Sequence, residues 1–236
     1  MEKNMKWGLV FLCGVFLSGC GVNPLVHNIK SHDVDEGSGV LVGSVAKAEN
    51  LGEFLEYGFW IEKTDHGYSR SIKIDNRSNL FNWKPAGPDF VTDIDSGRVF
   101  ALPFPPGEYR IADVRMDKIE GQMLRTMRSR KEFAIPVTIH PGKYNYLGEM
   151  RMVKISVPDR GGRRYFTVWV LSDQKDRDLS LLKEKYPKVG IQDALSVIPE
   201  TEVKPTPLVI IPAELDELIK NGLIVELGEK TLSSAD

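Results

Sequence analysis

Cysteine and histidine are scarce in this chain of 236 residues, which holds two cysteines and four histidines. Neither residue type occurs with the C-x-x-C or H-E-x-x-H spacing that zinc sites use. The histidines, at positions 27, 32, 66 and 140, are therefore interpreted as surface or turn residues. The sequence indicates no metal site.

Motifs of catalysis and cofactor binding are also missing. The chain has no G-x-S-x-G nucleophile turn, no G-x-G-x-x-G fingerprint and no P-loop, so we expect neither a serine hydrolase nor a nucleotide-dependent enzyme. The paired carboxylates of glycoside hydrolases leave no local pattern, so that class stays open without any residue that points to it. The sequence predicts a protein that is not an enzyme and holds no cofactor.

An excess of positive charge is missing too. The chain has 31 Lys and Arg residues against 33 Asp and Glu residues, a formal net charge of −2. This balance gives no support to electrostatic binding of nucleic acid. Hydrophobic residues make up 42% of the chain and charged residues 27%, which is the composition of an ordinary globular protein.

The apolar run at the N-terminus is too short to cross a membrane. It covers residues 7–17, eleven residues without a charge, and follows Lys3 and Lys6. A spanning helix needs about 20 apolar residues, whereas a charged start and a shorter apolar run are typical of a secretory signal peptide. We therefore expect residues 1–19 to be a signal peptide.

The four residues after this run, Leu17-Ser18-Gly19-Cys20, resemble the lipobox of bacterial lipoproteins. The resemblance implies cleavage before Cys20 and attachment of acyl chains to this cysteine, with palmitate among them. Two or three acyl chains hold a protein on a membrane essentially permanently. Because Gly21 stands where an aspartate would favour the inner membrane, the resemblance implies an anchor in the outer membrane facing the periplasm, with the inner membrane as the alternative.

The same cleavage decides the thiol chemistry of the mature chain. Cys13 would leave with the signal peptide and Cys20 would be acylated, so no disulfide and no cysteine nucleophile would remain. Residues 20–38 are mostly polar and lack periodicity, which predicts a tether between the anchor and the folded part.

From residue 39 the chain changes to short apolar segments separated by turns, which predicts a mainly β fold, an antiparallel β-sandwich over residues 39–188. The predicted strands cover residues 39–47, 54–63, 68–74, 98–102, 109–116, 132–139, 144–157 and 164–171. A short helix is predicted over 176–186, capped by Asp176 and stopped by Pro187. Residues 189–236 are predicted to be a Pro-rich extension with a second short helix over 213–221.

A Pro-Gly-charged-Tyr pattern occurs twice, at residues 106–109 and 141–144. Proline and glycine suit the two central positions of a type II turn, so the pattern predicts two similar hairpin turns or, alternatively, a paired binding edge. The stretch LPFPPGEYRI over 102–111 resembles the turn signature of transthyretin-like and carboxypeptidase-regulatory-like β-sandwiches. Together with residues 141–148, it is also similar to lipid-anchored bacterial β-sandwich families of unknown function. The resemblance implies a sandwich fold in the cell envelope and no catalytic residues.

One basic cluster stands between two predicted strands, and we expect it at the end of a long hairpin. It consists of Arg125, Arg128, Arg130 and Lys131. Such a cluster suits contact with an anionic lipid surface or an acidic partner, and a solvated hairpin is the alternative.

The predicted function is that of a lipid-anchored, non-catalytic interaction module of the cell envelope, with another envelope protein as partner. The alternative is a small-ligand or glycan-binding domain that uses Trp60, Trp83 and Trp169 for stacking.

Overall fold

The computed structural model describes residues 34–76, 87–128, 134–159, 161–187 and 190–199, and the two pairs 209–210 and 225–226. The predicted signal peptide, the acylation site Cys20, residues 20–33 of the tether and the second predicted helix lie outside these residues. Among the described helices, none combines the length and the apolar character that a membrane crossing requires.

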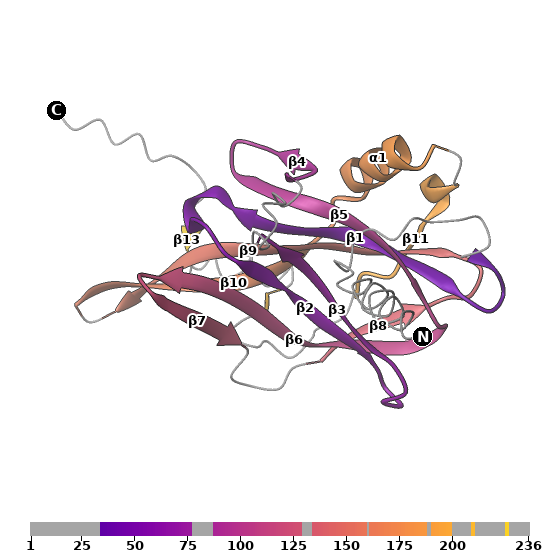
Figure 1. The fold of residues 1–236 in the computed structure, drawn as a ribbon, viewed down its shortest axis with the longest axis horizontal. Helices are drawn as coiled ribbons and strands as arrows, with labels where there is room; N and C mark the ends of the chain where they lie inside the picture. Colours follow the sequence, from indigo (N-terminus) through magenta and orange to yellow (C-terminus); the bar gives the residue numbers. More distant parts are fainter. Residues whose placement is uncertain are drawn as a thin grey trace, which may run out of the picture.

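Two sheets pack face to face, as the sequence predicted for a β-sandwich (Figure 1). The smaller sheet has five strands: β3 (Ser69–Asp75), β2 (Glu56–Lys63), β6 (Gly107–Glu120), β7 (Met123–Arg128) and, also paired with β6, β8 (Ile135–Ile139). The larger sheet has eight strands: β12 (Val209–Ile210), β10 (Gly162–Ser172), β9 (Tyr144–Asp159), β1 (Gly39–Ala48), β5 (Asp95–Phe104), β4 (Phe90–Val91) and, both paired with β9, β11 (Leu195–Ser196) and β13 (Val225–Glu226). The described helices are η2 (Glu49–Leu51), α1 (Lys175–Lys185) and η3 (Ile191–Asp193).

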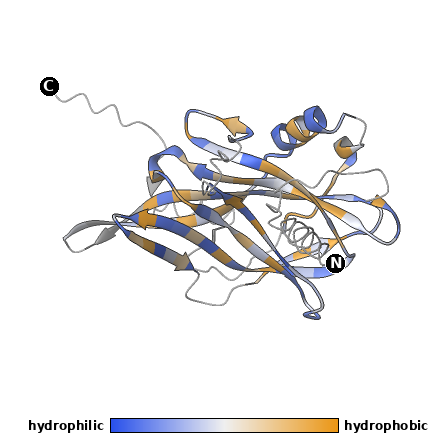
Figure 2. Ribbon diagram, viewed as in Figure 1, coloured by the Kyte–Doolittle hydropathy of each residue, from blue (hydrophilic) through white to orange (hydrophobic). Residues whose placement is uncertain are grey.

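The main core lies between the two sheets. Apolar and polar residues alternate along the strands (Figure 2), and one face of each sheet supplies the buried cluster that includes Leu41, Phe59, Phe100, Ile111 and Trp169. Each large side chain buried in this way contributes roughly 1.5–3 kcal/mol to folding. The outer face of the larger sheet is covered by α1, whose Leu179 and Leu182 are buried against it, whereas the outer face of the smaller sheet carries ion pairs.

The eight predicted strands are all present, and the structure adds five that the sequence did not reveal: β4, β7, β11, β12 and β13. Pairing in the smaller sheet is antiparallel throughout, as predicted. The larger sheet is mixed, because β1 pairs with β9 in parallel. Parallel neighbours need a long connection between them, and here the chain passes through the whole smaller sheet between β1 and β9.

The two Pro-Gly turns are not hairpin turns, which corrects the sequence prediction. The first turn joins β5 of the larger sheet to β6 of the smaller one, and the second joins β8 of the smaller sheet to β9 of the larger one. Both are therefore corners where the chain changes sheets. At the first corner, the Tyr109 hydroxyl donates a hydrogen bond of 2.6 Å to the Pro105 carbonyl. At the second, Gly142 has a φ of 63°, and the buried Asn145 side chain bonds the backbone of His140 and Lys143.

A bulge at Gly148 reverses the phase of β9. Between the aligned pairs Val42↔Tyr146 and Ser44↔Glu149, β9 uses one residue more than β1. Leu147 faces the core between the sheets, and strict alternation would turn Glu149 into that apolar core. The extra residue turns Glu149 to the outer face and leaves Met150 in the core. The φ of Gly148 is +104°, which side chains rarely tolerate.

Helix α1 begins after Gln174, whose side chain makes no capping hydrogen bond. The prediction that Asp176 caps this helix is wrong, because Asp176 lies in its first turn. An Asp173 carboxylate oxygen accepts a hydrogen bond of 2.9 Å from the Lys175 backbone amide instead. The helix ends at Lys185, before Pro187, as predicted.

Substitution of Gly148 by alanine tests the bulge. An added Cβ would lie 2.8 Å from the Ser172 carbonyl oxygen and would occupy a strained φ, so we expect a loss of about 1–3 kcal/mol in the free energy of unfolding. Urea unfolding measures it, with Gly190→Ala as the control because its Cβ would meet no atom within 4 Å. Equal midpoints for both variants would contradict the bulge.

Candidate functional site

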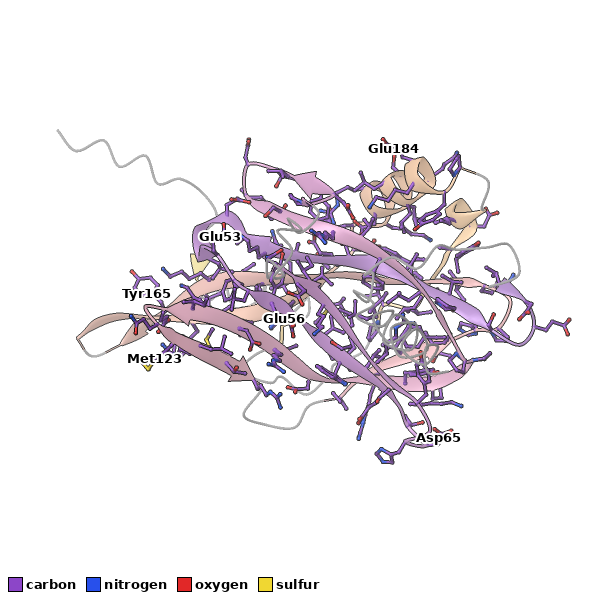
Figure 3. All side chains as sticks on the ribbon, viewed as in Figure 1. Glu53, Glu56, Asp65, Met123, Tyr165 and Glu184 are labelled. Atoms are coloured by element: carbon purple, nitrogen blue, oxygen red, sulfur yellow. The ribbon has the colours of Figure 1, made fainter. Side chains whose placement is uncertain are left out.

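Exposed apolar side chains gather at one end of the sandwich. Two hairpins, β6–β7 and β9–β10, end on the same side of the molecule, where Met123 and Tyr165 are labelled (Figure 3). Five of the eight large hydrophobic side chains found exposed among the described residues belong to these two hairpins: Ile119, Met123, Leu124, Tyr165 and Phe166. They lie on both faces of the hairpins, because Ile119 and Leu124 are out of phase with the core residue Met116 and because Tyr165 and Phe166 are adjacent in β10. Exposed apolar residues at one end of a domain are typical of interaction surfaces. We call these five residues the apolar end.

The two hairpins reach this end because the first strand of each is longer than the strands of the rest of the sandwich. Strand β6 has 14 residues and β9 has 16, compared with 10 in β1 and β5. Ile119 and Leu124 stand directly opposite each other across β6 and β7. They lie beyond Met116, which is the last residue of β6 in the core cluster. Their side chains are 54% and 60% exposed, so the hairpin carries an apolar pair with no cover.

Positive charge surrounds the apolar end. The described charged side chains here are the cations Arg115, Lys118, Arg125 and Arg128 on the first hairpin and Lys154 on the second, against the carboxylates Asp117 and Glu120. This gives the end a local charge of +3 in a chain whose net charge is −2. The Arg125 guanidinium pairs with Glu120 at 3.1 Å, and the Lys154 ammonium lies 4.8 Å from the centre of the Tyr165 ring.

The predicted basic cluster is only partly within the described residues, and its position differs from the prediction. Arg125 and Arg128 lie on strand β7 rather than at the end of a hairpin, and the turn of that hairpin is at Gly121, whose φ is 65°. Arg130 and Lys131 lie outside the described residues. Sequence reasoning missed Lys118 and Lys154 because each is a single lysine among strand residues, and only the pairing of the strands brings them to the same end.

The three tryptophans proposed for ligand stacking have different environments. Trp169 is fully buried in the core, so no ligand can reach it. Trp60 is half-buried on the outer face of the smaller sheet, opposite Ser71 and Asp113 in the neighbouring strands. Trp83 lies outside the described residues. Among the described tryptophans, Trp60 alone is available for stacking.

A buried polar network joins α1 to the larger sheet. The Arg177 guanidinium donates to Glu149 and to Asp178, both at 2.7 Å, and lies 3.9 Å from the centre of the Phe90 ring. The second oxygen of Asp178 accepts hydrogen bonds from the Ser44 hydroxyl at 2.7 Å and from the Tyr146 hydroxyl at 3.1 Å. Tyr146 in turn accepts from the Gln174 backbone amide at 2.9 Å, just before the helix begins.

Burial dominates the ionisation of this network. It raises the pKa of Glu149 and of Asp178 above the usual range, although the neighbouring Arg177 lowers both values. It also raises the pKa of the Tyr146 hydroxyl, with a further contribution from the Asp178 charge. Each carboxylate already has at least two partners inside the protein. A saturated network of this kind holds a helix in place and leaves no group directed at a substrate.

Metal-binding groups do not come together in the described part of the chain, where no cluster of three or more His, Cys, Asp or Glu side chains is found. The two described histidines lie at turns, as predicted: His66 joins β2 to β3 with a φ of 58°, and His140 precedes the second corner. No protein-family model, no curated protein and no solved structure matches the chain.

Replacement of Arg177 by methionine tests the network. The change leaves Glu149 and Asp178 buried without their shared cation, so we expect a loss of about 3 kcal/mol in the free energy of unfolding. Urea unfolding measures this loss, and Lys183→Met, at an exposed position of the same helix, is the matched control. A loss below 1 kcal/mol for Arg177→Met would show that the network does not hold α1.

Proposed function

We propose that this protein is a lipid-anchored, non-catalytic interaction module of the cell envelope. It is attached through Cys20 to the outer membrane and binds an envelope protein through its apolar end. The observation that carries this proposal is the combination of five uncovered apolar side chains with a local charge of +3. The complementary partner is a protein surface with acidic groups around an apolar groove.

The position of the tether favours a protein partner over the membrane that holds the anchor. The described chain begins beside the second corner, where the Gly142 amide donates to the Asp35 carbonyl at 2.9 Å. The apolar end lies at the other end of β9, which spans 16 residues. At about 3.3 Å per residue, this distance is roughly 50 Å. A module anchored through its tether thus presents the apolar end away from its own membrane.

Strand β7 offers a specific way of binding. It is the last strand of the smaller sheet, with β6 as its partner among the described strands. Nearly all of its side chains are exposed. An edge strand can accept a further strand from a partner through backbone hydrogen bonds. Arg125 and Arg128 would then select an acidic strand, while Ile119 and Leu124 would supply apolar contact.

The glycan-binding alternative depends on Trp60, the one described tryptophan on a polar face. Neighbouring polar positions of the same face are Ser71 and Asp113. A sugar ring could stack on this indole while its hydroxyls bond the polar side chains.

The anchor is tested at the two cysteines. We expect the mature protein to begin at Cys20 and to carry acyl chains, as read by mass spectrometry and by incorporation of labelled palmitate. Cys20→Ser should abolish both cleavage and label, because the acylated atom is gone, whereas Cys13→Ser should retain both. A mature chain with an unmodified Cys20 would contradict the anchor.

The apolar end is tested by site-specific crosslinking in intact envelopes. A photoreactive amino acid at position 123 should give a defined protein adduct, and the same group at the exposed position 184 on α1 should give none. Adding Arg125→Glu and Arg128→Glu should reduce the adduct at least about tenfold, because charge complementarity is reversed. Lys175→Glu and Lys183→Glu provide the matched charge control.

Three results would contradict this assignment. An adduct unaffected by charge reversal would dismiss the basic side chains. Binding of the lipid-free protein to phosphatidylglycerol vesicles, lost in the same variants and without any protein adduct, would assign the surface to lipid. Loss of partner binding in Trp60→Ala with no effect of the β7 variants would favour the glycan function.

A further inference from the structure

A cleft opens at one edge of the space between the two sheets. Its volume is about 500 Å³, within the range of small-molecule sites. Lys47 of β1 and Arg98 of β5 line it from the larger sheet, and Tyr57 of β2 lines it from the smaller sheet. Glu53, which lies at its rim, is labelled in Figure 3.

Lys47 places a cation in the cleft and makes no ion pair with a described residue. Lys47 as a whole residue is 7% exposed. It lies on the same face of β1 as the core residues Leu41 and Val45. The Lys47 ammonium forms no hydrogen bond and no ion pair with a described residue. The Lys47 ammonium itself reaches the water of the cleft, while the stem of the side chain is buried. With no ion pair to a described residue, this cation can bind an anion that enters the cleft.

Arg98 places a second cation beside the first. Arg98 stands opposite Val45 across β1 and β5, and Ser96 stands opposite Lys47, so the two cations are diagonal neighbours on one face of the sheet. Arg98 is half-buried, and its guanidinium also forms no hydrogen bond or ion pair with a described residue. Like charges at neighbouring sheet positions repel each other, and an anion between them would turn this repulsion into attraction.

Tyr57 adds a hydrogen-bond donor to the cations. The residue is 3% exposed, and its hydroxyl has no partner among the described residues. Burial raises the pKa of this phenol, and the nearby Glu53 and Glu49 raise it further while Arg98 lowers it. The hydroxyl therefore stays protonated at physiological pH and can donate a hydrogen bond to an oxyanion.

The rim of the cleft has the opposite charge. Glu49 and Glu53 line it with exposed side chains. These two carboxylates repel a ligand with more than one negative charge, while the inner cations attract a single negative charge. The lining also includes two apolar side chains, the buried Ile74 and the exposed Val91.

We propose that this cleft is a binding site for a small monoanionic carboxylate, held by Lys47, Arg98 and Tyr57. The ligand places its carboxylate between the two cations and accepts a hydrogen bond from the phenol. Its uncharged or cationic remainder faces Glu49 and Glu53. This site shares no residue with the apolar end.

Titration with N-acetylglycinate and with inorganic phosphate, followed by amide NMR spectra, tests the site. The carboxylate should cause saturable shifts around residues 47 and 98, and phosphate should bind at least about tenfold more weakly because of the rim carboxylates. Lys47→Met and Arg98→Met should each weaken N-acetylglycinate at least about tenfold, since each removes a charged partner. Lys183→Met on α1 should leave binding unchanged.

Stability separates a binding lysine from a structural one. Lys47→Met keeps most of the side-chain volume and removes a hydrated charge that makes no ion pair with a described residue, so we expect its thermal midpoint to stay within about 2 °C while binding is lost. A lower midpoint with unchanged binding would assign Lys47 to structure and overturn the site. Absence of saturable shifts with both anions would overturn it as well, and preferential binding of phosphate would overturn the assignment to a monoanion.

Discussion

The direction of the side chains in β9 is the constraint on which the rest of the structure depends. This strand pairs with β1, β10, β11 and β13, so its two faces define the interior and the exterior of the larger sheet. One extra residue at Gly148 turns Glu149 and Arg151 to the exterior and keeps Met150 and Met152 in the core. Without this residue, two charged groups would enter an apolar interior, and burial of unpaired charge is among the largest costs in folding.

The polar network on α1 follows from this phase change. Glu149 and Tyr146 both reach the exterior because the bulge lies between them, and the N-terminal turn of α1 then supplies Arg177 and Asp178. The buried groups satisfy each other, so the network fixes the helix over the sheet. This cluster of ionisable side chains is therefore structural. The charged groups that remain available to a partner or ligand lie elsewhere in the described chain.

The two surfaces for which function is proposed share one physical origin. Both lie where strands continue beyond the partners that cover them. Inward positions are apolar as long as the other sheet faces them, and they become charged where that cover ends, at Lys47 in β1, Lys118 in β6 and Lys154 in β9. Charged side chains cannot be packed in a dry interior, but at its margins they keep contact with water and remain available to a partner or ligand.

The sequence by itself determined eight of the strands, the first helix and the sandwich class, because apolar periodicity and turn residues are local properties of the chain. It also carries the whole case for the anchor at Cys20. It did not reveal strand β7, whose residues are nearly all exposed and lack a buried period, and it described the Pro-Gly corners as hairpins because a turn does not show which sheet receives the next strand. Only the tertiary structure decided that Lys47 lies beside Arg98 and that Met123 and Tyr165 share one end, since these neighbours are distant in sequence and meet through strand pairing and the packing of two sheets.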